Sequence, residues 1–241
     1  YRQANDNDLA SILNHIREQR ITNEDIEILN KCKDTVIEND AITLFSRRLK
    51  VDLYNQEWLS RINWKEYILR WFSQWEFSKE KPVEEEITVK IWAKIIMRSN
   101  DSDWFWVNWS FWTIKDIIEK DWDVNHLVVE VDWINCDVYR NEWKNNSYEL
   151  WEDNILKEIV LWTYYQFPIQ LAYAITIHKS QWLTFDHCQM ELQDVFAWWQ
   201  GYTALSRVKS LSWLKIKWSV DKESFYFSNR IFEFKEWMKD R

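Results

Sequence analysis

The residues at the turns of this chain are the strongest constraint on how it can fold. Its 241 residues include one glycine and 20 tryptophans, whereas an average glycine content of about 7 % would give about 17 glycines. Because glycine is used where φ is positive or where the backbone passes close to a neighbour, an indole at such a place is expected to clash or to lie exposed. Tryptophan occupies several turn-like stretches: DSDWFWVNWSFWTI (101–114), EKDWDVN (119–125) and FAWWQGY (196–202).

We interpret most of these tryptophans as positions where the natural protein has glycine. This would follow if a codon that the source organism reads as glycine had been translated as tryptophan. The alternative is a tryptophan-rich protein that presents an aromatic binding surface. The mass of the natural protein distinguishes the two interpretations.

Composition and charge limit the class of protein. With 46 % hydrophobic residues, the chain can bury one sizeable core or two small ones. Its three cysteines, Cys32, Cys136 and Cys188, form no CxxC pair, which favours a reducing, cytoplasmic location. No apolar run reaches the roughly 20 residues of a membrane span, so no membrane partner is expected. The net charge of −8 excludes a generic nucleic-acid coat, although residues 161–218 carry five basic and three acidic side chains.

Hydrophobic periodicity predicts an α/β domain that is interrupted by a β-rich insertion. The α/β parts are residues 1–83 and 161–241, and the insertion, which we expect to be a small barrel, is 84–160. Thr22 and Asp25 are spaced as an N-terminal helix cap. Predicted helices cover 8–20, 22–29, 49–60, 199–208 and 228–240, and predicted strands cover 41–46, 86–90, 93–99, 111–118, 126–132, 134–140, 188–192 and 214–218.

Two polar clusters carry the chemistry of the chain. The first is a run of side chains with polar ends in a six-residue stretch: Thr176, His178, Lys179, Ser180 and Gln181. The second is QGYTALSRVKS (200–210), in which Arg207 follows Ser206. Taken singly, a histidine of this kind is usually a surface or core residue, and an arginine on a helix usually forms a surface salt bridge. Their combination is more specific.

With Trp182 taken as glycine, AITIHKSQWLTFD (174–186) followed by YTALSRVKS (202–210) closely resembles the fifth and sixth motifs of superfamily 1 DNA helicases. The similar branch is the one with the RecD and Pif-type enzymes, and YRQ at the N-terminus resembles the end of their fourth motif. The resemblance covers nearly all of residues 1–220. At positions 106 and 143 the family itself tolerates tryptophan, but this chain has tryptophan where the family has glycine at 92, 109, 112, 162, 182, 199 and 213.

The resemblance implies the second RecA-like motor domain of a helicase, an α/β fold with a parallel sheet flanked by helices and an inserted small β-barrel. In such motors ATP lies between two RecA-like domains. Arg207 matches the sixth-motif arginine finger that reaches the γ-phosphate, a catalytic role that contributes about 10³–10⁵ in rate in related phosphoryl transfers. Arg2 matches a fourth-motif arginine with a similar role, while Gln181 and the backbone at Trp182 are expected to face the nucleotide.

The same resemblance places the other side of the fifth motif against single-stranded DNA. Thr176, His178, Lys179 and Ser180 are the expected contacts to DNA, made without reading its sequence. One turn would then touch both ATP and DNA and couple them. In the insertion, the candidates for DNA-backbone contacts are Lys94, Arg98 and Asn108, for which a solvated surface is an equally good interpretation.

A phosphate loop of the form GxxxxGK[ST] is absent from the sequence, even when every tryptophan counts as glycine. Trp64–Lys65 and Trp143–Lys144 are the only pairs that would read as Gly-Lys, and neither precedes serine or threonine. We therefore expect the C-terminal part of a longer ATP-dependent DNA helicase, whose first RecA-like domain supplies the phosphate loop and the Mg²⁺ ligands. No metal site is expected in this chain, and alone it should not hydrolyse ATP. The alternative is a non-catalytic module that binds single-stranded nucleic acid or serves as a scaffold.

Overall fold

The computed structural model describes residues 6–37, 41–74, 81–150, 156–197 and 199–225. The chain forms two compact units. Unit 1 joins residues 1–56 to 173–241, and unit 2 is the segment 57–172 between them. The chain therefore leaves unit 1 and returns to it, while the predicted domains 1–83, 84–160 and 161–241 remain predictions.

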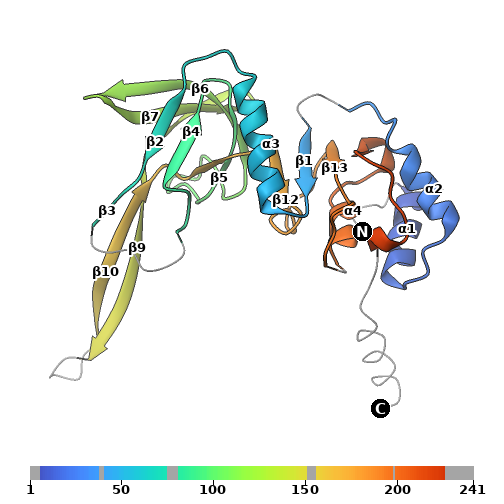
Figure 1. The fold of residues 1–241 in the computed structure, drawn as a ribbon. Coiled ribbons are helices and arrows are strands. Elements are labelled where there is room, and N and C mark those ends of the chain that lie inside the picture. The colour runs from blue at the N-terminus through green and yellow to red at the C-terminus, as the bar shows by residue number, and fades with distance from the viewer. Residues whose placement is uncertain (1–5, 38–40, 75–80, 151–155, 198, 226–241) are drawn as a thin grey trace. The chain divides into compact units, whose positions relative to one another are not determined.

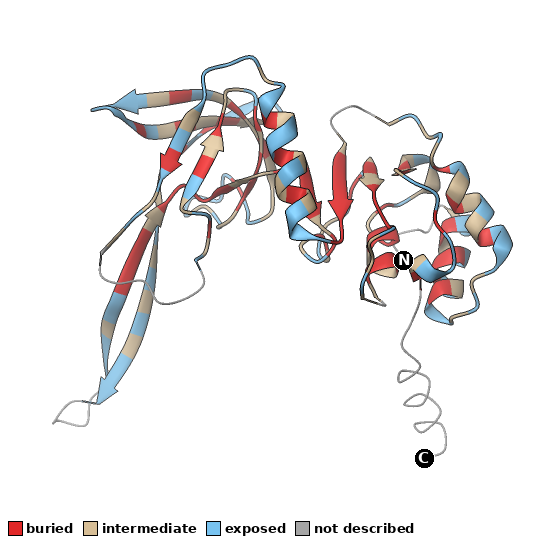
Figure 2. Cartoon of the chain, viewed as in Figure 1, coloured by how far each residue is buried: buried red, intermediate tan, exposed pale blue. Residues whose placement is uncertain are grey.

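Unit 1 is built on a parallel sheet, as the sequence predicted. Its order is β12-β1-β13-β14, and all three pairings are parallel. The central strand β1 is buried at all four of its positions (Figure 2), as expected for a parallel strand that is covered on both faces. The strands are β1 (Ile42–Phe45), β12 (Ala174–Thr176), β13 (Cys188–Met190) and β14 (Leu214–Ile216) (Figure 1).

Local sequence explains the helices of unit 1. In α1 the apolar stripe Leu9, Ile12, Leu13 and Ile16 is buried. The side chain of Thr22 accepts a hydrogen bond from the amide of Asp25, whose own side chain accepts one from the amide of Thr22, and this capping box begins α2 as predicted. The helices are α1 (Asn7–Arg17), α2 (Asn23–Lys31), α3 (Arg48–Ser60), whose residues from 57 on belong to unit 2, and α4 (Gln200–Leu205), with short 3₁₀ turns η1 (Leu211–Trp213) and η2 (Glu223–Phe225).

Two helix predictions need comment. The helix predicted over 199–208 is shorter, because α4 ends at Leu205 and the chain turns through Ser206 and Arg207. Arg207 therefore lies outside the helix, and its backbone carbonyl accepts a hydrogen bond from the amide of Phe185. The helix predicted at 228–240 lies outside the described residues. Among the residues that are described, no helix is long and apolar enough to cross a membrane.

Unit 2 is made of antiparallel strands around its own core. A five-stranded sheet has the order β11-β5-β6-β7-β8, while β2 pairs with β4, and β10 lies between β3 and β9. Its core includes the fully buried Ile95, Ile114, Val129 and Phe167. The strands are β2 (Tyr67–Arg70), β3 (Phe72–Gln74), β4 (Glu86–Val89), β5 (Lys94–Met97), β6 (Phe111–Lys120), β7 (Asp123–Val131), β8 (Ile134–Val138), β9 (Asn141–Leu150), β10 (Leu156–Gln166) and β11 (Ile169–Leu171).

Unit 2 extends beyond the predicted insertion of 84–160 on both sides. Strands β2 and β3 precede residue 84, yet they pair with β4 and β10. At the other end, β11 pairs with β5, so the chain returns to unit 1 only at residue 173. The described strands pair as three separate sheets in this unit, and the predicted barrel remains a prediction.

Tryptophan takes the backbone conformation of glycine at several turns. The described non-glycine residues with positive φ include five tryptophans, with φ between 63° and 73°: Trp92, Trp104, Trp109, Trp122 and Trp133. Two of them close hairpins whose loops are Asp121-Trp122 and Asp132-Trp133, with φ positive at both positions of each loop. A two-residue loop of this kind is a type I′ turn, for which Asp-Gly is a preferred sequence.

Gly201, the single glycine of the chain, serves a different purpose. Its φ is not positive, but a Cβ atom there would lie 2.7 Å from the carbonyl oxygen of Ser224. It permits a close approach between α4 and η2. The left-handed turns that glycine usually forms are therefore formed in this chain by other residues, with tryptophan foremost among them.

Candidate functional site

The first polar cluster forms a turn at the carboxyl edge of the parallel sheet. Residues 177–182 follow β12 directly, and loops at this edge of an α/β sheet commonly bind ligands. Asn55 of α3 fixes the strand that leads into the turn, because its side chain accepts from the amide of Ala174 at 2.8 Å and donates to the carbonyl of Ala174 at 3.1 Å. The amide of Leu183 closes the turn on the carbonyl of Ser180 at 2.9 Å.

The side chains of this turn divide into accessible and buried ones. His178 is exposed, with its ring 5.5 Å from that of Trp199. Thr176 and Lys179 are half-buried, and the Thr176 hydroxyl accepts from the amide of Lys179 at 3.3 Å. The prediction that Ser180 contacts DNA needs correction: its side chain is fully buried, and its hydroxyl donates to the carbonyl of Ile177 at 2.7 Å. Ser180 shapes the turn from inside.

Trp182 lies at the tip of the turn with 90 % of its surface exposed. Its φ is not positive, so the backbone of the turn does not itself require glycine here. Gln181 beside it is half-buried. Of the two outcomes expected for an indole at such a place, a clash or exposure to solvent, the structure shows exposure.

The second polar cluster lies against the first. Phe185 and Val208 form a parallel β-bridge, and the amide of Phe185 donates to the carbonyl of Arg207 at 3.0 Å. An exposed ion pair at 3.1 Å joins Lys209 to Asp186 on the same seam. The two motifs that the sequence predicted to act together are therefore adjacent in unit 1.

The guanidinium of Arg207 connects these segments most closely. Its Nη1 donates to the carbonyls of Ser180 at 3.3 Å, Gln181, and Leu183 at 3.4 Å. On its own segment, Nε donates to the carbonyl of Thr203 at 2.9 Å and Nη2 to the hydroxyl of Ser206 at 2.7 Å. The side chain is half-buried. Arg207 is thus bound to the turn that also carries the exposed His178.

Sequence reasoning missed a second charged connection at the same edge of the sheet. Lys50 of α3 bonds to Glu191 and Asp194 in the loop after β13, and Lys217 lies 3.5 Å from Glu191, which is buried. The hydrogen bonds that Lys50 donates to Asp194 and then to Glu191 raise the pKa of Lys50 above its ordinary value. Lys50 lies more than 100 residues from both of its partners, so no local pattern could have indicated these pairs.

The other predicted contact residues have separate surroundings. Arg2 lies outside the described residues. Arg98 is tied into unit 2, because its guanidinium donates to Gln170 at 3.1 Å and lies over the Trp109 ring at 4.6 Å. Lys94 is half-buried and Asn108 is exposed. Of Lys94, Arg98 and Asn108, only Asn108 is exposed, and the contacts of all three to the DNA backbone stay predictions.

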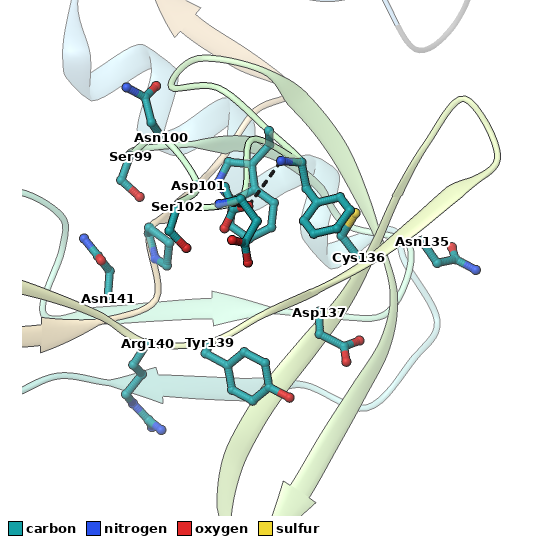
Figure 3. Close-up of a pocket in the computed structure, with 14 residues that line it drawn as sticks. Ser99, Asn100, Asp101, Ser102, Asn135, Cys136, Asp137, Tyr139, Arg140 and Asn141 are labelled. Atoms are coloured by element: carbon teal, nitrogen blue, oxygen red, sulfur yellow. Dashed lines mark hydrogen bonds between the residues drawn. The ribbon is translucent and has the colours of Figure 1, made fainter.

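Unit 2 also contains a polar pocket, which Figure 3 shows in close-up. It is lined by the segment that follows β5, by β8 itself and by the segment after β8, among them Asp101, Asp137 and Arg140. The carboxylate of Asp101 accepts hydrogen bonds from the amides of Asp103 and Phe105 at 3.0 and 3.2 Å. The pocket includes none of the predicted nucleotide or DNA residues. In the described part of the chain, no three histidine, cysteine or acidic side chains group as metal ligands.

Comparison with known proteins identifies relatives over most of the chain. No family model matches it. The ATP-dependent DNA helicase Pif1 of Bdellovibrio bacteriovorus is 28 % identical over 222 residues, which are 89 % of this chain and 48 % of the relative. Pif1 of Campylobacter jejuni is 30 % identical over 210 residues, 80 % of this chain and 46 % of the relative. The chain thus spans about half the length of these curated relatives.

Solved structures show the same likeness in three dimensions. A crystal structure of Pif1 helicase from Bacteroides, in complex with ADP-AlF3 and single-stranded DNA, matches with a TM-score of 0.79 and 25 % identity, covering 100 % of this chain and 56 % of the other. Pif1 helicase from Candida albicans shares the fold with a TM-score of 0.83 at 18 % identity. Over most of its length the chain is thus similar to Pif1 helicases in sequence and in fold.

Proposed function

We propose that this chain is the second RecA-like motor domain of an ATP-dependent DNA helicase that moves along single-stranded DNA. The observation that carries the proposal is the contact between the fifth-motif turn at 177–182 and Arg207 of the sixth motif. It brings the guanidinium of Arg207, the cation proposed to meet ATP, onto the carbonyls of a turn that also carries the exposed His178. Support comes from the relatives, which are named ATP-dependent DNA helicases, and from the Bacteroides structure with ADP-AlF3 and single-stranded DNA.

Arg207 is the proposed arginine finger. An arginine offers five N–H donors in a planar fork that matches phosphate oxygens, and it adds positive charge where the transition state spreads negative charge. Gln181 and the backbone at Trp182 complete the proposed nucleotide face. Because the described residues hold no cluster of metal ligands, and the sequence lacks a phosphate loop, the first RecA-like domain is proposed to hold the phosphates and Mg²⁺.

Single-stranded DNA is proposed to run along the opposite face of the turn. Thr176, His178 and Lys179 offer a hydroxyl, an imidazole and an ammonium group, which suit contacts to phosphate and sugar and carry no base specificity. The net charge of −8 is compatible with such a local site, because residues 161–218 carry the excess of basic side chains.

The test uses the protein with both motor domains, in a Trp182→Gly background. Arg207→Ala is expected to lower ATP hydrolysis by about 10³-fold or more and to abolish unwinding, while nucleotide-free affinity for single-stranded DNA stays within about tenfold. Lys209→Ala is the matched control, since it removes a neighbouring surface cation that is paired with Asp186. ATP hydrolysis that survives Arg207→Ala, or DNA binding that is lost together with hydrolysis, would refute the assigned role. A parent protein that binds DNA and never hydrolyses ATP would instead be a non-catalytic module.

A further inference from the structure

Strand β8 forms an open edge of the five-stranded sheet in unit 2. Among the described residues it pairs only with β7, in an unbroken register that begins with Val131 opposite Ile134. In an antiparallel ladder closed by a two-residue loop, alternate residues point their backbone N–H and C=O groups away from the partner strand. In β8 these residues are Asn135 and Asp137. No hydrogen bond outside the β7 ladder is described for their backbone groups, so this edge can pair with another strand.

The polar pocket of unit 2 lies along this edge. The two outward-facing residues, Asn135 and Asp137, both line the pocket, together with residues from the segment 99–106. Figure 3 shows Asp101 on one side of the pocket and Asp137 and Tyr139 on the other. The pocket has a volume of about 730 Å³, which is in the range of ligand sites. It is therefore large enough to take side chains of a segment that pairs with β8.

The charge of the pocket is predominantly negative. Its lining includes the carboxylates of Asp101, Asp103 and Asp137 and one cationic side chain, Arg140. The guanidinium of Arg140 is already bound to the carboxylate of Asp123 at 2.8 Å. In the described part of the chain, no ion pair involves Asp103 or Asp137, and both are exposed. Because the potential of a surface selects ligands of the opposite charge, this pocket favours positive side chains and disfavours a phosphate backbone.

Aromatic groups add a second kind of contact. The rings of Phe105 and Tyr139 line the pocket with 64 % and 54 % of their surface exposed, and the face of such a ring attracts a guanidinium or ammonium group. Trp106 also lines the pocket. It is 8 % exposed, and its Nε1 is a buried donor without a hydrogen-bond partner among the described residues. A donor of this kind is costly to leave unpaired, and a peptide carbonyl is a suitable acceptor.

We propose that the edge of β8 binds an extended segment of a partner protein that carries lysine or arginine side chains. The segment adds to the sheet as a further strand and bonds to the outward-facing backbone groups of Asn135 and Asp137. Its basic side chains enter the pocket and meet the carboxylates and the exposed rings. Backbone pairing supplies the affinity, and the pocket supplies the preference for basic side chains. The surface uses none of the residues proposed to meet ATP or DNA, so this inference is independent of the proposed function.

Peptide binding to the 241-residue chain tests the inference. The background is Trp104→Gly/Trp133→Gly, which removes two exposed indoles that lie next to the pocket segments in sequence. The probe is a short capped peptide of alternating valine and arginine, and its affinity is measured by isothermal titration calorimetry. A matched peptide of alternating valine and glutamate should bind at least about tenfold more weakly. Equal binding of the two peptides would overturn the inference.

N-methylation of the probe separates strand addition from attraction between charges. A strand bonds to its neighbour through alternate residues, so methyl groups on the arginine amides block one edge of the peptide and methyl groups on the valine amides block the other. Neither change alters the charge. One methylated peptide should lose at least about tenfold in affinity, whereas the other should bind as the unmodified probe does. Equal affinities of the two methylated peptides would contradict pairing with β8.

A protein variant tests the pocket itself. Asp137→Asn removes one exposed negative charge at nearly constant shape and should weaken binding of the arginine probe at least about fivefold. Asp121→Asn is the matched control, because it removes an exposed carboxylate from the loop between β6 and β7 and should leave the affinity within about twofold. Unchanged affinity in Asp137→Asn would refute the role of the pocket. Single-stranded DNA should bind both variants like the parent, and a change of more than about threefold in Asp137→Asn alone would place nucleic acid on this edge instead.

Discussion

Replacing the tryptophans of two hairpin loops by glycine should stabilise the protein. Trp122 and Trp133 have φ values of 69° and 67° and exposed fractions of 105 % and 90 %. An L-residue in the left-handed region pays a steric cost that glycine avoids. Because these indoles are fully exposed, their removal sacrifices little buried surface. The double variant Trp122→Gly/Trp133→Gly therefore changes stability mainly through the steric cost of the left-handed backbone.

The magnitude follows from two opposing contributions. Relief of the left-handed conformation is worth about 1–2 kcal/mol per residue, and the greater freedom of glycine in the unfolded chain removes about 0.4–1 kcal/mol of that gain. The net gain is about 0.5–1 kcal/mol per loop. The loops lie at opposite ends of the nine-residue strand β7, so their contributions should add to about 1–2 kcal/mol of unfolding free energy.

Urea denaturation of the 241-residue chain measures the effect. With a slope of about 1–3 kcal/mol per molar urea, the midpoint should rise by roughly 0.5–1 M. The matched control is Trp122→Ala/Trp133→Ala, which removes both indoles but keeps the Cβ atoms that cause the strain. If the alanine variant is as stable as the glycine variant, the gain comes from removing indoles and the argument from φ is refuted.

The natural protein supplies an independent measurement. Trypsin cleaves after Lys120 and Arg140, so both hairpin tryptophans leave in one peptide, residues 121–140. If glycine occupies both positions in the natural protein, this peptide will be lighter by twice the difference between tryptophan and glycine. A peptide with the mass of the printed sequence would show that the organism makes tryptophan there and accommodates the strain.

Two further predictions concern unit 1. Burial alone would raise the pKa of Asp25, but hydrogen bonds from Thr22 and His15 hold it below its ordinary value of 3.8. The stability that Asp25 contributes is therefore present above that value and is lost as pH falls through the folded pKa. Asp25→Asn should lower the free energy of unfolding by about 1 kcal/mol in urea denaturation at pH 7 and reduce the loss of stability at acid pH, and an unchanged loss of stability at acid pH would contradict the assignment. Trp182→Gly should leave the unfolding free energy unchanged or slightly lower, because φ is not positive there, yet raise ATP turnover in the protein with both motor domains; equal turnover with tryptophan would contradict the close approach of nucleotide.

Sequence patterns predicted the elements whose stabilisation is local. The capping box of Thr22 and Asp25 involves residues three apart, and the buried stripe of α1 repeats at helical spacing, so both are readable from a short window. In the second α/β part, β13 (CQM) and β14 (LKI) each alternate apolar and polar residues, a pattern typical of strands. Their parallel order with β1 followed from the family resemblance, which carries information that a single pattern lacks.

What the sequence did not predict depends on partners far along the chain. Strand β9, NEWKNNSYEL, has the polar composition of a loop, and only its long pairing with β10 makes it a strand; Figure 2 shows the distal parts of both strands largely exposed. The bonds of Arg207 to carbonyls had no sequence pattern either, because every residue has a carbonyl. The burial of Ser180 is similar, since a hydroxyl serves equally well inside a turn or toward a ligand.

Glycine is required either where φ is positive or where the backbone closely approaches a neighbour. For this reason, the evidence that a tryptophan stands in place of glycine differs from one position to another. Positive φ is a property of the chain itself, so it is visible at Trp122 and Trp133 without any ligand. Close approach is a property of a pair, and it shows in the folded chain only when the neighbour belongs to the same chain, as Ser224 does for Gly201. At Trp182 the proposed neighbour is a nucleotide held by another domain, so an unstrained, exposed indole is what the isolated chain should show even if that position requires glycine. Whether position 182 requires glycine is decided by the family resemblance and by the turnover measurement. At the two hairpin loops the same question is decided by the positive φ of the backbone.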